Sequence, residues 1–295
     1  MLFIISLISG ILMPRFTKLL PSSLLLAMPV AYLALGESFA LISGEVDLAS
    51  GSVLILVNAV AASIYTDYNI TGPLFVLIPI AVGIFTGITH GILISYGRLN
   101  SFLLTVGTSF MWSGLALVIL REPRGSIPVW FSNIFASNFG GIPIALWALF
   151  LACGIWLAFY YSPLSLTFYA VGSATRTAYT LGIDVKRMKL YAFILNGFVA
   201  GLAGLIMTGI VGSGDPRLGA TSTLVAILAA LVGGASFSGG SGNGLGAIAA
   251  AIGLQFARNL VAWVGVTYYL LDLIYGAIIV ILMALISFGR SKIAV

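Results

Sequence analysis

The sequence contains very little charge. Only 7% of its 295 residues are Asp, Glu, Lys or Arg, whereas a soluble domain has about 25%. Apolar residues make up 60% of the chain, and the mean hydropathy is +1.15. Water cannot solvate the surface of such a chain, so this composition predicts that a lipid bilayer is its principal solvent.

Cysteine and histidine are also scarce. The chain has one cysteine, Cys153, and one histidine, His90. These counts exclude a disulfide framework within the chain, a cysteine metal cluster and any site that needs paired histidines. We expect Cys153 to be a packing residue inside an apolar run. We expect His90 to be a hydrogen-bonded residue at a helix interface.

The signatures of an enzyme are missing as well. None of the four lysines follows a glycine, so the Gly-Lys-Ser/Thr of a phosphate-binding P-loop is absent. We therefore expect that the chain is not an enzyme and binds no cofactor of its own. The net charge of +5 is modest and belongs to no soluble basic domain, so no nucleic-acid partner is expected.

Long apolar runs dominate the sequence, and a helix needs about 20 apolar residues to cross the hydrocarbon core. We predict an all-α, polytopic membrane bundle of nine or ten segments, forming a single transmembrane domain over 1–295 in the cell membrane. We interpret the run at 2–13 as a helix that is retained and not cleaved as a signal peptide. The runs 2–13, 52–65 and 221–235 are short enough to be half-helices or re-entrant segments. The runs are 2–13, 22–43, 52–65, 73–97, 101–120, 143–161, 190–211, 221–235, 244–265 and 268–288.

Two glycine-rich interruptions carry polar residues into these apolar surroundings. Glu37 lies in ALGESFAL, and Glu45 and Asp47 follow in LISGEVDLASGS. An ionised carboxylate at bilayer depth costs at least about 2.5–3.5 kcal/mol, so it usually faces a cavity or a partner. The second interruption, GGASFSGGSG (233–242), aligns with the first over 44–51 and places Ser236 opposite Asp47. The pattern favours broken helices around a pathway, with a solvated loop at 44–51 as the alternative.

The segment 171–189 is a polar island in this chain. It contains Arg176, Asp184, Lys186, Arg187 and Lys189, five of the 21 charged residues. Local signals predict a short helix over 174–181 that Ser173 caps and Gly182 ends, after which Asp184 caps the next helix. We expect this loop, about 162–190, to be cytoplasmic and to dock a soluble partner; an ordinary solvated connector is the alternative.

Four stretches in series resemble the ribose-type permeases of ATP-binding-cassette (ABC) importers for simple sugars, within the branched-chain amino acid-type permease superfamily. They are FALISGEVDLASGSVLIL, RLNSFLLTVGTSFMWSGLALVI, FYAVGSATRTAYTLGIDVKRMKLYAFILNGFVAGLAGL and LVGGASFSGGSGNGLGA. The resemblance implies a second permease copy or paralogue, an extracytoplasmic solute-binding protein, and cytoplasmic ATP-binding cassette subunits that bind the ATP and Mg²⁺. It also implies that the helix at 174–181 inserts into a groove of the ATPase.

On this basis we expect a permease that moves a monosaccharide or similar small polar solute by alternating access. Alternatives are an ABC permease for nucleosides or branched-chain amino acids, an ion-coupled secondary transporter that uses Glu37 or Asp47, and a membrane scaffold without a pathway. This chain departs from the family pattern at Glu37, Glu45 and Ser173-Ala174. The expected pathway residues are Glu37, Glu45, Asp47, Asn58 and Ser236, and the expected ATPase-coupling residues are Ser173, Arg176, Tyr179, Gly182 and Asp184.

Overall fold

The computed structural model describes residues 16–219 and 221–263 and the single positions 270, 273 and 277. The expected first run, 2–13, lies outside the described residues. The last run, 268–288, also lies outside them except for three positions.

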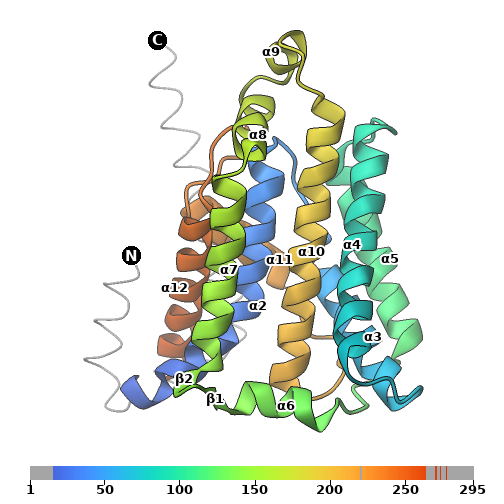
Figure 1. Cartoon of the computed structure of the whole chain (residues 1–295), viewed down its shortest axis with the longest axis vertical. Coiled ribbons are helices and arrows are strands. Elements are labelled where there is room, and N and C mark those ends of the chain that lie inside the picture. The colour runs from blue at the N-terminus through green and yellow to red at the C-terminus, as the bar shows by residue number, and fades with distance from the viewer. Residues whose placement is uncertain (1–15, 220, 264–269, 271–272, 274–276, 278–295) are drawn as a thin grey trace.

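The described chain is helical almost throughout, which confirms the all-α, polytopic class (Figure 1). The one departure is a two-stranded hairpin, β1 with β2, that pairs Phe139 with Ile142. The elements are α2 (Phe16–Ile42), α3 (Ser50–Thr66), α4 (Pro73–Ser95), α5 (Ser101–Ile119), α6 (Val129–Ala136), β1 (Asn138–Phe139), β2 (Ile142–Pro143), α7 (Ile144–Tyr160), α8 (Pro163–Ser173), α9 (Thr175–Thr180), α10 (Val185–Val211), α11 (Ser222–Val232) and α12 (Gly244–Trp263).

Four described helices are long and apolar enough to cross a membrane: α2 from Leu20, α4, α5 and α10. A fifth candidate is the pair α7 and α8, which is bent by 75°. Pro163 lies in the first turn of α8, a position where its missing N–H and fixed φ are tolerated, and it explains why a new helix begins there. α3 and α11 are shorter apolar helices, in agreement with the half-length segments expected at 52–65 and 221–235.

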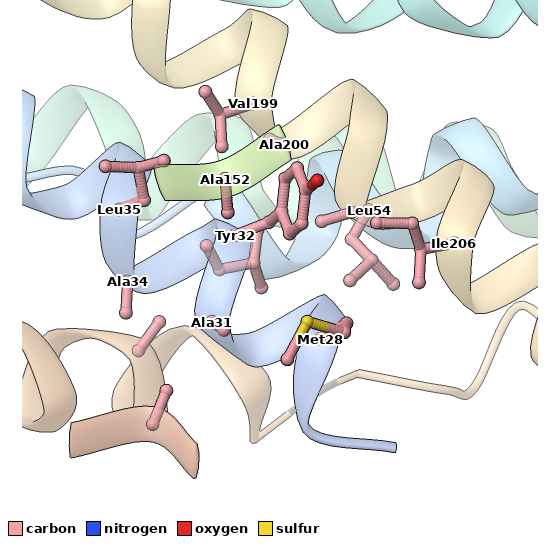
Figure 2. Close-up of a cluster of buried hydrophobic side chains, with 14 of the residues drawn as sticks. Met28, Ala31, Tyr32, Ala34, Leu35, Leu54, Ala152, Val199, Ala200 and Ile206 are labelled. Carbon is pink, nitrogen blue, oxygen red and sulfur yellow. The ribbon is translucent and has the colours of Figure 1, made fainter. Parts of the chain in front are cut away.

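Helix α2 forms the centre of the bundle. In the most apolar stretch of α2, 83% of the residues are buried inside the protein, whereas the corresponding share for α5 is 17%. The apolar side chains of α5 therefore face outward, as lipid-facing residues do. Figure 2 shows Met28, Tyr32 and Leu35 of α2 packed against side chains of α3, α7 and α10. The Tyr32 hydroxyl donates to the carbonyl of Ala148 in α7, at 2.8 Å, so its polar end is satisfied in the core.

Helices α4 and α10 are in backbone contact. A Cβ atom on Gly83 would lie 2.5 Å from the carbonyl oxygen of Gly197 and 2.8 Å from the Cα atom of Gly201. Only glycine permits this approach, which is the way small residues bring transmembrane helices together. α4 and α10 therefore form a closely locked pair.

The two ends of the bundle differ. α9 projects at one end, where the loop between α4 and α5 also lies, whereas α6 and the hairpin lie at the opposite end (Figure 1). At that opposite end the loops after α5 and α10 are tied together, because Arg124 and Gly214 exchange backbone hydrogen bonds of 3.0 and 3.1 Å.

The two glycine-rich interruptions meet in space. Residues 43–49 separate α2 from α3, and residues 233–243 separate α11 from α12. The Gly240 N–H donates to the carbonyl of Ile42 at 3.0 Å, and a Cβ atom on Gly239 would lie 2.7 Å from the Cα atom of Gly44. Both breaks that the sequence predicts are therefore present and adjacent.

Candidate functional site

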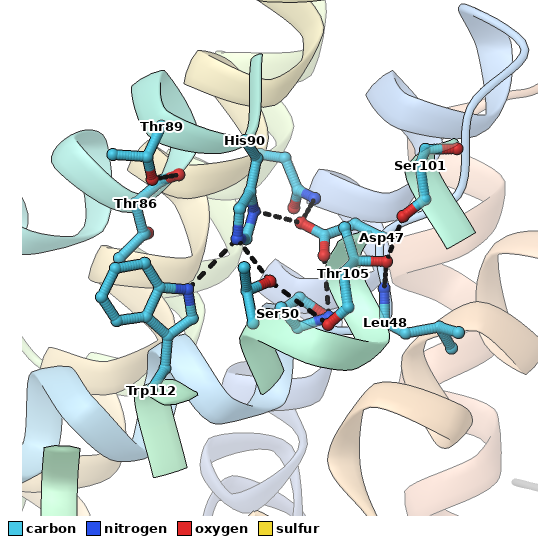
Figure 3. Close-up of polar contacts among 12 residues, drawn as sticks. Asp47, Leu48, Ser50, Thr86, Thr89, His90, Ser101, Thr105 and Trp112 are labelled. Carbon is cyan, nitrogen blue, oxygen red and sulfur yellow. Dashed lines mark hydrogen bonds and ion pairs between the residues drawn. The ribbon is translucent and has the colours of Figure 1, made fainter. Parts of the chain in front are cut away.

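Asp47 lies at the centre of a buried polar cluster in the break between α2 and α3 (Figure 3). Its Oδ1 accepts from the Ala49 N–H at 2.7 Å, and its Oδ2 accepts from the Asn196 Nδ2 of α10 at 2.8 Å. The Asp47 side chain is 5% exposed. Because it sits at the amino end of α3, the helix dipole also favours its negative charge.

His90 of α4 completes the surroundings of this carboxylate. Its Nδ1 lies 3.7 Å from Asp47 Oδ2, and its Nε2 accepts from the indole N–H of Trp112 at 3.1 Å. An indole N–H can only donate, so Nε2 carries no proton and the neutral ring has its proton on Nδ1, toward Asp47. The expectation of a hydrogen-bonded His90 at a helix interface is confirmed, since Trp112 and the further partner Thr108 belong to α5.

Glu37 reaches the same place from the middle of α2. Its Oε1 accepts from the hydroxyl of Ser50, the first residue of α3, at 2.7 Å. The residue is fully buried, and among the described residues its second oxygen, Oε2, has no hydrogen-bond partner. The two carboxyl groups that the sequence predicts at the pathway, Glu37 and Asp47, therefore meet at the amino end of α3.

The backbone of the break is held by α5. The Leu48 N–H donates to Thr105 Oγ1 at 3.0 Å, and the Val46 N–H approaches Ser101 Oγ at 3.5 Å. These contacts satisfy amides that no helix or strand pairs. Within the segment 44–49, Asp47 and Ala49 are buried, Glu45, Val46 and Leu48 are half-buried, and Gly44 is exposed.

Glu45 forms an ion pair with Lys189, near the start of α10. The pair is largely buried, with side chains 11% and 22% exposed. The structure therefore places Glu45 in the break between α2 and α3, with its charge matched by Lys189 of α10.

The other two expected pathway residues lie elsewhere. Asn58 ties α3 to the loop after α10: its Nδ2 donates to Thr208 Oγ1 at 2.9 Å and to the Ser213 carbonyl, and its Oδ1 accepts from the Asp215 N–H at 2.8 Å. Ser236 hydrogen-bonds Ser238 within the second break. The hydrogen bonds of Asn58 thus lie outside the cluster around Asp47, whereas Ser236 lies in the break adjacent to it.

Asn196, Trp112 and Lys189 belong to the site and were not expected there. Asn196 stands in the apolar stretch KLYAFILNGFVAG, where a buried amide is a detectable signal. The partnerships themselves join positions 149 and 144 residues apart, Asn196 with Asp47 and Lys189 with Glu45, and local sequence does not show them.

The expected loop, about 162–190, contains the helices α8 and α9 and the start of α10, so residues 163–173 are helical. α9 spans Thr175–Thr180, within one residue of the expected 174–181. Gly182 ends it with φ +83°, and Asp184 Oδ1 caps α10 by accepting from the Arg187 N–H at 3.1 Å, as expected.

The expectation that Ser173 caps the short helix is wrong. Its hydroxyl donates back to the carbonyl of Tyr169, at 2.7 Å, and the residue is the last of α8. The cap position is Ala174, which has no side chain that can accept. A serine at the end of a preceding helix can satisfy its hydroxyl within that helix, and here this bond replaces the cap.

α9 and the turn after it, residues 175–184, form an exposed projection that we call the knob. Arg176 and Gly182 are exposed, and Tyr179 is 73% exposed. A hollow of about 880 Å³ lies against the knob, between α9 and the start of α10. Its lining residues are Thr175, Arg176, Tyr179, Gly182, Ile183, Asp184, Val185 and Lys186.

Metal chemistry has no evident place in this site. Within 16–219 and 221–263, no group of three or more His, Cys, Asp or Glu side chains could hold a metal ion. Asp47 and His90 are occupied by protein donors and acceptors.

Comparison with known proteins places these features in a family. The model of the family described as "Branched-chain amino acid transport system / permease component" matches residues 19–283. No solved structure matches the chain significantly.

Three similar proteins illustrate the relationship. The chain is 32% identical to the D-allose transport system permease protein AlsC of Escherichia coli, over 84% of this chain and 77% of the relative. It is 30% identical to the ribose import permease protein RbsC of Haemophilus influenzae, over 81% and 76%. It is 27% identical to the autoinducer 2 import system permease protein LsrD of Salmonella paratyphi B, over 89% and 80%.

Proposed function

Because the chain belongs to the branched-chain amino acid transport system / permease component family, we propose that it is the permease of an ABC importer for a monosaccharide. The observation that carries this proposal is the similarity over more than four-fifths of the chain to permeases named for ribose and D-allose. The apolar spans of the structure are those of a multi-pass membrane protein.

The driving force comes from separate ATPase subunits in the cytoplasm. They bind the exposed knob of α9, where Arg176 and Tyr179 supply a cation and an aromatic ring and Gly182 and Asp184 fix the turn into α10. The turn formed by Gly182 and the Asp184 cap supports this assignment, because a docking element must keep its shape under load. Ser173 belongs to the end of α8 and positions α9 only through the backbone.

Glu37 and Asp47 are the polar residues of the pathway. Both are buried in this conformation, so a solute reaches them only after the break between α2 and α3 has moved, as alternating access requires. A solute with several hydroxyl groups suits the site because carboxylates, Asn196 and Ser50 can each exchange hydrogen bonds with hydroxyls. The complete importer also contains a second permease subunit and an extracytoplasmic solute-binding protein.

Uptake by proteoliposomes tests the proposal. The permease, the ATPase subunits and the binding protein are reconstituted, and uptake of labelled D-ribose and D-allose is measured with and without ATP. We expect uptake that needs ATP, survives an uncoupler and stops when the Walker lysine of the ATPase is replaced. Uptake that stops with the uncoupler and ignores the Walker substitution would favour the ion-coupled alternative.

Two substitutions test the docking role of α9. Arg176→Glu reverses a charge on the knob, and Gly182→Pro is incompatible with the φ of +83° that ends α9. Both variants should insert and fold but lose uptake while ATP is still hydrolysed. Normal coupled uptake in both variants would contradict the docking role.

A further inference from the structure

Both acidic residues of the α2–α3 break are held by one helix. Lys189 of α10 forms the ion pair with Glu45, and Asn196 of α10 donates to Asp47. Positions 189 and 196 are seven residues apart, which is two helical turns, so their side chains project from the same face about 10 Å apart. α10 therefore holds the segment 44–49 at two points.

The helix that holds the break begins where the docking knob ends. Only residues 181–184 separate α9 from α10, and this turn is fixed by Gly182 at φ +83° and by the Asp184 cap. Lys189 lies in the second turn of α10. A displacement of α9 thus reaches Lys189 through a short, capped connection and one turn of helix.

α4 makes the holding helix stiffer and adds a third contact. It is locked to α10 by the backbone approach of Gly83 to Gly197, and it carries His90, whose Nδ1 faces Asp47 at 3.7 Å. Lys189, Asn196 and His90 are therefore three contacts from one rigid pair of helices onto the same short segment.

The segment on the other side of these contacts lies between two helices. Gly44 has φ +84°, and the residues up to Ala49 belong to no helix or strand. Beyond them, Ser50 at the start of α3 holds Glu37 of α2 through its 2.7 Å hydrogen bond. A shift of segment 44–49 therefore moves the amino end of α3 against α2, at the two pathway carboxylates.

We propose that Lys189 and Asn196 are positioning residues that transmit the movement of α9 to the α2–α3 break, through Glu45 and Asp47. This inference rests on the proposed function, because it requires an ATPase that moves α9. When α9 is displaced, α10 and α4 move as one body and carry Glu45 and Asp47 with them. The break then changes its position between α2 and α3, which opens or closes the pathway around Glu37.

The test measures how many solute molecules enter per ATP hydrolysed by the reconstituted importer. Lys189→Ala and Glu45→Ala each remove one side of the ion pair, and each should lower this ratio about tenfold while ATP hydrolysis stays within about twofold. The charge-swapped double variant, Glu45→Lys with Lys189→Glu, should recover most of the ratio. Lys189→Arg keeps the ion pair and should keep the ratio.

Arg187→Ala is the matched control. It removes a cation from the same helix two residues earlier, where the side chain is 65% exposed and pairs with Asp184, within its own turn. Asn196→Ala should lower the ratio like Lys189→Ala. If Lys189→Ala does not assemble, the ratio of solute uptake to ATP hydrolysis is measured for Lys189→Gln instead. This variant retains a hydrogen-bond donor without the charge.

Three results would overturn the inference. They are an unchanged ratio in the single variants, a swapped variant no better than either single variant, and parallel losses of uptake and ATP hydrolysis with an unchanged ratio. The failure of the proposed function is recognised separately, because the unaltered importer would then show no uptake that depends on ATP hydrolysis.

Discussion

Replacement of Asp47 tests whether its carboxylate holds the break between α2 and α3. Asp47→Ala removes the acceptor of the Ala49 N–H and of the Asn196 Nδ2, which donate over 2.7 and 2.8 Å. Both donors are buried, with Ala49 0% and Asn196 1% exposed, so water does not replace the lost acceptor. A buried donor without a partner costs about 1–3 kcal/mol, so the two together predict a loss of about 2–6 kcal/mol.

Asp47→Asn is the informative companion because it preserves shape. The oxygen of the new amide still accepts from Ala49. Its nitrogen is a donor, and Asn196 can meet it by turning its own amide, since Asn196 Oδ1 has no partner in the described structure. We therefore expect Asp47→Asn to lose only about 1 kcal/mol, the net value of an ordinary hydrogen bond.

The assay is the melting temperature of the purified protein in detergent, followed by size-exclusion chromatography after heating. The expected difference of about 1–5 kcal/mol between the variants corresponds to at least about 2–4 °C, at about 2–4 °C per kcal/mol. Asp67→Ala serves as control, because that carboxylate is 38% exposed and pairs at 4.0 Å with Arg124. Equal shifts for Asp47→Ala and Asp47→Asn, or a more stable Asp47→Ala, would refute the reasoning.

Three more predictions use the same stability assay together with uptake. Asn58→Ala should cost about 1–3 kcal/mol by leaving the Asp215 N–H without its acceptor, and proteolysis of the 212–218 loop should rise; unchanged proteolysis would contradict this. Gly83→Ala should lower the free energy of unfolding by about 1–3 kcal/mol by forcing α4 away from α10. Gly154→Ala, whose new Cβ atom would meet no atom of the described structure within 4 Å, should be neutral or stabilising. Similar shifts in both variants would argue against the close approach of α4 and α10. Glu37→Gln should keep the Ser50 bond and the melting temperature, so a changed solute profile would place the residue on the pathway.

Local signals in the sequence located most helices and both breaks. The apolar runs are long enough to be read directly, and the turn into α10 was predicted because Gly182 and Asp184 act through their own backbone neighbourhood. Ser173 shows the limit of such signals. Its hydroxyl can either accept from a backbone N–H of α9 or donate to a carbonyl of α8, and in the structure it donates to the carbonyl of Tyr169 in α8.

The site itself depends on packing that no local pattern encodes. Asp47 and Glu37 were found because carboxylates are rare in apolar stretches. The contacts of Asp47 with Asn196 and His90, and of Glu45 with Lys189, were missed because these three partners come from α4 and α10, which glycine contacts bring together. The partners of Asn58 were missed for the same reason, since Thr208, Ser213 and Asp215 come near it through the docking of α3 on α10.

The central claim is that this membrane protein is driven through α9, and site-specific photocrosslinking tests it most directly. A photoreactive amino acid replaces Tyr179, which is 73% exposed on the knob, or Trp130 of α6, which is 41% exposed at the opposite end (Figure 1). In the assembled importer, position 179 should crosslink to the ATPase subunit and position 130 should not. A crosslink from position 179 to the solute-binding protein, or from position 130 to the ATPase, would contradict the account.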